Sequence, residues 1–153
     1  MDAYSFDASA LIKRYVNEAG STWVQSLFDL PGRRNYIARI GSVEVVAALT
    51  RLAKGGYISS GDASINIAAF RHDLATQYVA VPVNRQTISF AMDLAETHTL
   101  RGYDAVQLAC ALAANARRQA MGGSALTLIS ADIELNAAAT MEGLAVDDPN
   151  RHP

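Results

Sequence analysis

The chain has 153 residues, of which 50% are hydrophobic and 18% are charged, as in an ordinary soluble globular protein of one domain. Its 13 basic and 15 acidic residues give a net charge of −2, so the basic excess that accompanies strong nonspecific binding to nucleic acid is absent. The single cysteine, Cys110, excludes an intramolecular disulfide, and its apolar neighbours predict a core residue. Uncharged runs are too short to span a membrane and the first residues lack a signal-peptide pattern, so we expect a cytoplasmic protein.

Strands and helices alternate along the chain. We expect strands at residues 3–6, 36–40, 78–83, 126–129 and 144–146, and helices at residues 8–15, 18–30, 43–54, 62–77, 85–98, 102–121 and 133–142. Pro82 limits the third strand to a short strand or one at a sheet edge, because proline cannot donate a ladder hydrogen bond. The alternation predicts a three-layer α/β/α fold with a mainly parallel sheet of about five strands. Residues 1–149 would form one domain and residues 150–153 a disordered tail.

Four acidic residues have equivalent positions near the start of a helix: Asp7, Glu44, Asp104 and Asp132. At Asp7 the sequence leaves two explanations open, since aspartate caps helices well and the carboxyl end of a parallel strand is also where ligands bind. If the four acids converge, each pair about 5 Å apart repels by roughly 3 kcal/mol at an effective dielectric near 20. A cation would relieve this repulsion, and oxygen-only ligands favour Mg²⁺ or Mn²⁺ over zinc.

The remaining reactive side chains indicate no other site. His72, His98 and His152 have no partners at metal-ligand spacing, so we expect structural or surface roles for them and neither zinc catalysis nor a histidine-based triad. Two arginine pairs, Arg33–Arg34 and Arg117–Arg118, could form local phosphate-binding patches or simply lie on a solvated surface.

Four segments together resemble a known family: Phe6-Asp7-Ala8-Ser9-Ala10-Leu11, Val43-Glu44-Val45, Tyr103-Asp104-Ala105-Val106-Gln107-Leu108-Ala109 and Ser130-Ala131-Asp132. In this order, and across almost the whole chain, they resemble a PIN domain, and within that family a VapC-type toxin of a VapBC toxin–antitoxin pair. The resemblance implies a Mg²⁺-dependent endoribonuclease that acts on RNA, is commonly a homodimer and is held inactive by a small antitoxin protein.

The same resemblance assigns roles to individual residues. Asp7, Glu44, Asp104 and Asp132 match the acidic quartet that binds metal, and Ser9 and Ser130 match the small hydroxyl residues near the first and last acids. Three aspartates would hold one or two Mg²⁺ ions, with Glu44 binding directly or through water, and cleavage would leave a 5′-phosphate and a 3′-hydroxyl. Leu135 stands where many relatives have an aromatic residue, which we interpret as packing. Glu134 could be an additional acid at the site, but we expect it to face solvent.

Two rival functions remain for comparison. A phosphatase of the haloacid dehalogenase type would use Asp7 as nucleophile, but that family needs a second aspartate two residues later, where this chain has Ser9. The other rival is a non-catalytic PIN-fold domain that binds RNA or acts as a scaffold, in which the acids only cap helices. Incubation with labelled RNA, with and without EDTA, separates these possibilities.

Overall fold

Five short parallel strands form one sheet at the centre of the molecule. A computed structural model describes residues 2–153, and its strands are β1 (Ala3–Phe6), β2 (Arg34–Ala38), β3 (Tyr78–Val81), β4 (Leu126–Ile129) and β5 (Ala145–Asp147). Their order is β3-β2-β1-β4-β5, with Ala3 of β1 aligned with Arg34 of β2 and Leu126 of β4. The expected five-stranded parallel sheet is confirmed, and β3 is at an edge and ends immediately before Pro82, as the missing donor of proline requires.

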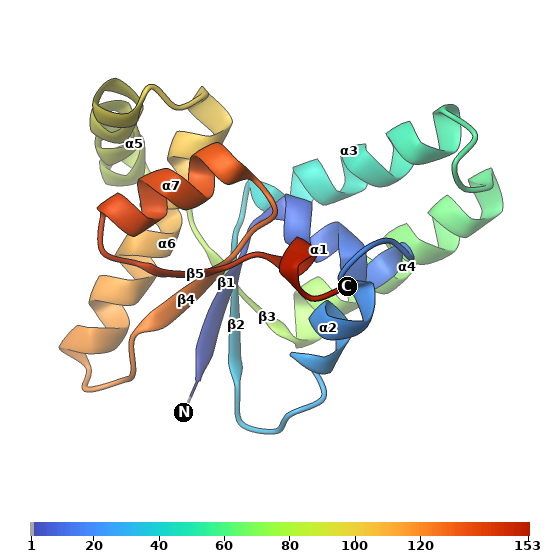
Figure 1. Ribbon diagram of the computed structural model, residues 1–153, viewed down its shortest axis with the longest axis horizontal. Helices are drawn as coiled ribbons and strands as arrows, with labels where there is room; N and C mark the ends of the chain where they lie inside the picture. Colours follow the sequence, from blue (N-terminus) through green and yellow to red (C-terminus); the bar gives the residue numbers. More distant parts are fainter. Residues whose placement is uncertain (1) are drawn as a thin grey trace.

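Helices cover both faces of the sheet, as parallel strands require. They are α1 (Ala8–Tyr15), α2 (Ser21–Ser26), α3 (Gly41–Lys54), α4 (Ser60–Thr76), α5 (Arg85–His98), α6 (Gly102–Ala120) and α7 (Ile133–Met141). Figure 1 shows α1–α4 on one side of the sheet and α5–α7 on the other. Among residues 2–153, no helix combines the length and the hydropathy needed to cross a bilayer.

Side chains on the two faces of each strand fill two separate hydrophobic clusters. Phe6, Ile37 and Ile129 pack under α1–α4, whereas Leu126 and Leu128 pack under α5–α7. Each of these side chains is almost completely buried, and burying one contributes about 1.5–3 kcal/mol. Alternate strand residues therefore fix the sheet between its two helix layers, and the carboxyl ends of the strands lie along one edge.

The second helix is much shorter than the expected helix at residues 18–30. Gly20 has a positive φ of 83°, which interrupts any helix that would begin at Glu18. The Ser21 hydroxyl accepts a hydrogen bond from the Glu18 amide and donates one to the Val16 carbonyl, so these turn contacts replace helical ones. Only the central part of the apolar pattern, at Ser21–Ser26, is helical.

The expected disordered tail is instead an ordered segment. Pro149–Arg151 forms a short 3₁₀ helix, and the Asp148 side chain accepts a hydrogen bond from the Asn150 amide at its start. The His152 ring stacks on Trp23 with 4.0 Å between ring centroids and hydrogen-bonds the Asp147 carboxylate at 2.8 Å. These contacts tie the segment to α2, which a sequence pattern cannot predict because they join residues about 130 positions apart.

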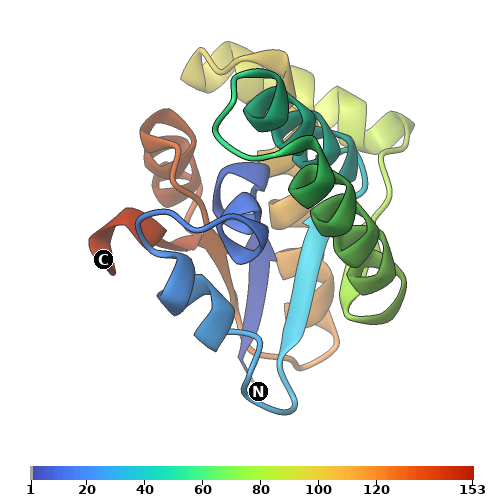
Figure 2. The same ribbon diagram turned by 90° about the vertical axis from the view of Figure 1, so that its right-hand side faces the viewer.

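Two helices project beyond the sheet. α3 and α4 pack against each other as a hairpin whose far end extends past the other elements (Figures 1 and 2). Large apolar side chains on this hairpin face solvent: Val43 is 65% exposed, Tyr57 81% and Ile65 68%.

Candidate active site

The four acidic residues singled out in the sequence line one pocket. Asp7 is the N-cap of α1, Asp132 is the N-cap of α7, and Glu44 and Asp104 lie in the first turns of α3 and α6. All four contribute to a cavity of about 420 Å³. The structure thus gathers acids that are up to 125 positions apart, because every one of these helices starts at the carboxyl edge of the sheet.

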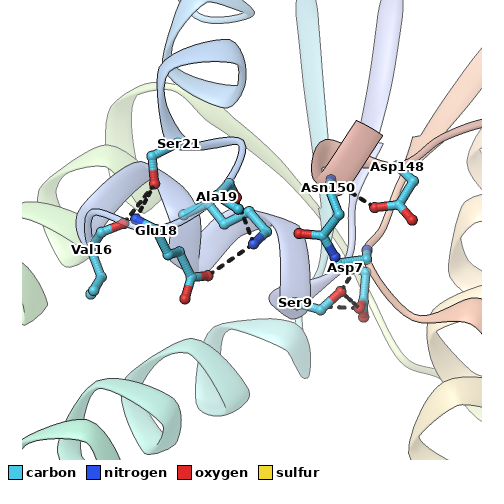
Figure 3. Close-up of polar contacts among 10 residues, drawn as sticks. Asp7, Ser9, Val16, Glu18, Ala19, Ser21, Asp148 and Asn150 are labelled. Atoms are coloured by element: carbon cyan, nitrogen blue, oxygen red, sulfur yellow. Dashed lines mark hydrogen bonds and ion pairs between the residues drawn. The ribbon is translucent and has the colours of Figure 1, made fainter. Parts of the chain in front are cut away.

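Asp7 is buried and only partly satisfied. Its Oδ2 accepts hydrogen bonds from the Ser9 hydroxyl and, at 3.2 Å, from the Ser9 amide, as Figure 3 shows. Its Oδ1 is also buried but has no hydrogen-bond partner in the described part of the chain. Burial is the main reason that the pKa of Asp7 is raised above its ordinary value, although the Ser9 hydrogen bonds oppose the shift.

Two serines hold the acidic turns in place. The Ser9 hydroxyl accepts a hydrogen bond of 3.0 Å from the Ala131 amide, which ties the start of α1 to the loop after β4. The fully buried Ser130 accepts one of 3.1 Å from the Asp132 amide. Ser9 and Ser130 therefore position Asp7 and Asp132, as outer-shell groups commonly position ligands.

The pKa of Asp104 reflects the negative charge of the pocket. Its pKa is raised to about 6 by burial and, to a smaller extent, by the charges of Asp132 and Asp7. Arg101 opposes the shift. Glu44 is less buried, and its carboxylate lies 3.9 Å from the Arg51 guanidinium in a loose, exposed ion pair.

Three further polar residues line the pocket that the sequence analysis did not select as site residues: Arg51, Arg101 and Tyr103. Arg51 follows Glu44 by seven positions, which places both on one face of α3, so helical spacing could have identified it. Arg101 directly precedes α6 and Tyr103 lies in its first turn. The Tyr103 hydroxyl accepts a hydrogen bond from the Gln107 amide group, and burial raises the tyrosine pKa.

Two neighbouring residues agree with the sequence interpretation. Leu135 is completely buried and belongs to the cluster under α5–α7, so its role is packing. Glu134 is exposed and does not line the pocket. Neither residue extends the acidic site.

The ligand types in the pocket suit a hard metal ion, whereas the spacing of the described side chains does not provide three ligands for one ion. The candidate ligands are all carboxylate oxygens, and the unpartnered Oδ1 of Asp7 is available as one donor. Within residues 2–153, however, no three His, Cys, Asp or Glu side chains are grouped closely enough to hold one ion. An ion held by one or two of these carboxylates together with water fits this arrangement, because Mg²⁺ usually keeps several water ligands.

Comparison with known proteins identifies the fold. No protein-family model matches the chain, and no curated protein sequence matches it significantly. Among solved structures, PAE2754 from Pyrobaculum aerophilum aligns over 98% of this chain and 85% of its own, with 19% identity and a TM-score of 0.66. A toxin–antitoxin complex from Klebsiella pneumoniae aligns over 95% and 97%, with 21% identity and a TM-score of 0.63.

A third similar structure is VapBC2 from Rickettsia felis, bound to a DNA fragment from its promoter. It aligns over 95% of this chain and 98% of its own, with 11% identity and a TM-score of 0.62. The chain has a PIN-like fold. This likeness spans nearly the full length of the PIN-like neighbours, which confirms the fold that the four sequence segments predicted.

Proposed function

We propose that this PIN-like chain is a VapC-type endoribonuclease that requires Mg²⁺, or Mn²⁺ as a substitute. The observation that carries the proposal is the arrival of Asp7, Glu44, Asp104 and Asp132 in one pocket from four separate elements. Helix capping alone explains Asp7 and Asp132, which do accept hydrogen bonds from helix amides. It does not explain Asp104 and Glu44, which no cap hydrogen bond uses.

The chain's own residues would divide the work as follows. Asp7, Asp104 and Asp132 would hold the ion, with Glu44 as a direct or water-mediated ligand. The Ser9 hydroxyl donates to the Asp7 carboxylate, and the Ser130 hydroxyl accepts from the backbone amide of Asp132. The bound ion would supply a more acidic attacking water and neutralise charge on the phosphate. In-line attack would leave a 5′-phosphate and a 3′-hydroxyl.

Two arginines at the pocket suit an anionic substrate. Arg51 and Arg101 line the same cavity as the acids, and a guanidinium group matches a phosphate oxygen pair in shape. They would contact RNA phosphates beside the cleaved bond. This placement explains how a pocket of negative charge in a protein of net charge −2 can accept a polyanion.

We further propose that the chain is the toxin of a toxin–antitoxin pair in the cytoplasm, that a small antitoxin protein inhibits it, and that it forms a homodimer. The Klebsiella neighbour is a toxin–antitoxin complex, and the Rickettsia neighbour is a VapBC protein. The α3–α4 hairpin also extends beyond the sheet and carries the exposed apolar side chains Val43, Tyr57 and Ile65, which a protein partner would cover.

Cleavage of labelled RNA by the full chain tests the catalytic proposal. We expect cleavage with Mg²⁺, none with EDTA, and a loss of about 10³-fold or more in Asp7→Asn, which keeps the size of the side chain. Asp93→Asn, an exposed aspartate of α5, is the matched control and should retain full activity. Cleavage that survives chelation, or that Asp7→Asn leaves intact, would contradict the proposal.

One observation favours the non-catalytic alternative, an RNA-binding or scaffold domain with the same fold. Among residues 2–153, no three acidic, histidine or cysteine side chains are grouped closely enough to hold one ion together. If the chain binds RNA but cleaves none of a broad panel in Mg²⁺ or Mn²⁺, the alternative is correct.

A further inference from the structure

A second, larger pocket lies between the sheet and α5 and α6. Its volume is about 510 Å³, within the range of about 300–1,000 Å³ that is usual for small-molecule sites. It is bounded by β2, β3, the start of α5 and the end of α6, and it shares no lining residue with the acidic pocket. We call it the arginine pocket, after the lining residues Arg34, Arg117 and Arg118.

The charges of the arginine pocket are all positive. Its three arginines come from β2 and from the end of α6, and none of its lining residues is acidic. The structure thereby separates Arg33 from Arg34 but keeps Arg117 and Arg118 together. Arg33 lies over the Tyr4 ring and 3.8 Å from the Asp2 carboxylate, whereas Arg34 joins Arg117 and Arg118.

The three guanidinium groups differ in how they are held. Arg118 donates from Nε to the Ser124 carbonyl at 3.1 Å and from Nη2 to the Ser124 hydroxyl at 3.0 Å, so it is fixed in place. The side chains of Arg34 and Arg117 form no ion pair or hydrogen bond with any of residues 2–153 and are exposed. The guanidinium groups of Arg34 and Arg117 are therefore available to an incoming anion, next to that of Arg118, which hydrogen bonds hold in place.

The rest of the pocket is apolar, and it is open because of the sheet topology. α6 packs over β2 and β4 and leaves the edge strand β3 partly uncovered. Val79, Val81 and Pro82 therefore form a wall, and the 79% exposed Met121 also lines the pocket. At the far end, the Asn84 side chain lines the pocket with its amide nitrogen free of hydrogen bonds to residues 2–153.

We propose that the arginine pocket binds a nucleotide, with its phosphate on Arg34 and Arg117 and its base against the wall formed by β3 and Pro82. Paired guanidinium groups favour a phosphate, which accepts several forked hydrogen bonds at once. The apolar wall and the single amide donor of Asn84 suit a planar ring with polar edges, which inorganic phosphate lacks. The same chemistry is present in a free mononucleotide and in one nucleotide of an RNA strand.

Binding measurements in EDTA test this proposal without involving cleavage. The full chain would be titrated by calorimetry with AMP, UMP, adenosine, inorganic phosphate and a short single-stranded RNA. We expect saturable binding of at least one nucleotide probe, with adenosine and phosphate each weaker by about tenfold or more. Arg34→Gln with Arg117→Gln should weaken nucleotide binding by about tenfold or more, because two charged contacts are lost.

Arg71→Gln is the matched control, since Arg71 is an exposed arginine of α4 on the other side of the sheet, and it should bind as the wild type does. If the RNA binds more tightly than the mononucleotides and the double variant weakens it, the natural ligand is a strand; equal affinities indicate a free nucleotide. The proposal is overturned if no nucleotide probe saturates, if phosphate alone binds as well as AMP, or if the double variant binds normally. The three substituted side chains, Arg34, Arg71 and Arg117, are exposed. Circular dichroism verifies that the variants are folded.

Discussion

Two clusters of charged side chains differ in whether each charge has a partner. In the first, between α1, α4 and β3, Arg14 donates to the Tyr78 hydroxyl at 2.6 Å and lies 3.4 Å from the Asp73 carboxylate. The Tyr15 hydroxyl donates to the same carboxylate at 2.7 Å, and the Arg14 guanidinium lies 3.9 Å from the centre of the Phe28 ring. Each charge in this cluster has an opposite charge or an oriented dipole beside it.

The acidic pocket has no such balance. Asp7 keeps one buried oxygen without a partner, and Asp104 has a pKa of about 6 because burial and neighbouring carboxylates disfavour its charge. The first cluster therefore stabilises this chain, whereas the second holds carboxylates in a state that a bound cation or a proton would relieve. Functional sites commonly reduce stability in this way.

The largest effect should come from Asp104→Asn. We expect cleavage of labelled RNA to fall by about 10³-fold or more, equivalent to about 4 kcal/mol of transition-state stabilisation, because the substitution removes a charge from the proposed ion site. Single-turnover rates measure it. Full activity in Asp104→Asn would show that the unbalanced charge of the acidic pocket is not needed for cleavage, and would contradict a functional role for it.

Asp73→Ala should have the largest effect on stability. It leaves the buried Arg14 charge and the Tyr15 hydroxyl without a main partner, so we expect the free energy of unfolding to fall by about 2–4 kcal/mol. Urea denaturation measures this change, with the exposed Asp93→Ala as control. RNA cleavage by the folded fraction should remain normal, and a selective loss of activity would connect the two clusters.

The pH dependence of stability should identify Asp104 directly. Its folded pKa of about 6 exceeds the ordinary value of 3.8, so the folded state binds the proton more tightly. Without metal, the free energy of unfolding should therefore fall as pH rises from about 4 to about 6, by at most about 3 kcal/mol, and then level off. Asp104→Asn should lose this part of the dependence, and identical curves for the two proteins would refute the assignment.

Added Mg²⁺ should stabilise the wild type at pH 7.5. A ligand that binds only the folded state contributes about 2.7 kcal/mol at a concentration 100 times its Kd. We expect a rise in Tm with Mg²⁺ concentration in the wild type and none in Asp7→Asn. Equal shifts in both proteins would show that the ion binds elsewhere.

Arg51→Gln should have the smallest effect on stability. Its pair with Glu44 is exposed and 3.9 Å long, so we expect the free energy of unfolding to change by less than about 0.5 kcal/mol. KM for RNA should rise roughly threefold to tenfold with kcat nearly unchanged, because a phosphate contact is lost. An unchanged KM would remove Arg51 from substrate binding.

The sequence predicted the sheet and the acidic pocket because both follow from local pattern. Once the strands at residues 3–6 and 126–129 are parallel neighbours, Asp7 and Asp132 must follow them at the same edge. The arginine pocket was not predictable, because Arg34 meets Arg117 only through the packing of α6 on β2. Burial of single side chains was equally hard to predict. In α5, Ala91 is buried, but the next residue, Met92, is 67% exposed.

The stacking of His152 on Trp23 provides a spectroscopic handle. Trp23 is the only tryptophan in the sequence, so the intrinsic emission of the protein comes from one indole whose face is covered by an imidazole. Release of residues 149–152 from α2 would uncover that face and change the intensity and the wavelength maximum of the emission. A fluorimeter can therefore follow this one contact without any label, including while antitoxin or RNA is added.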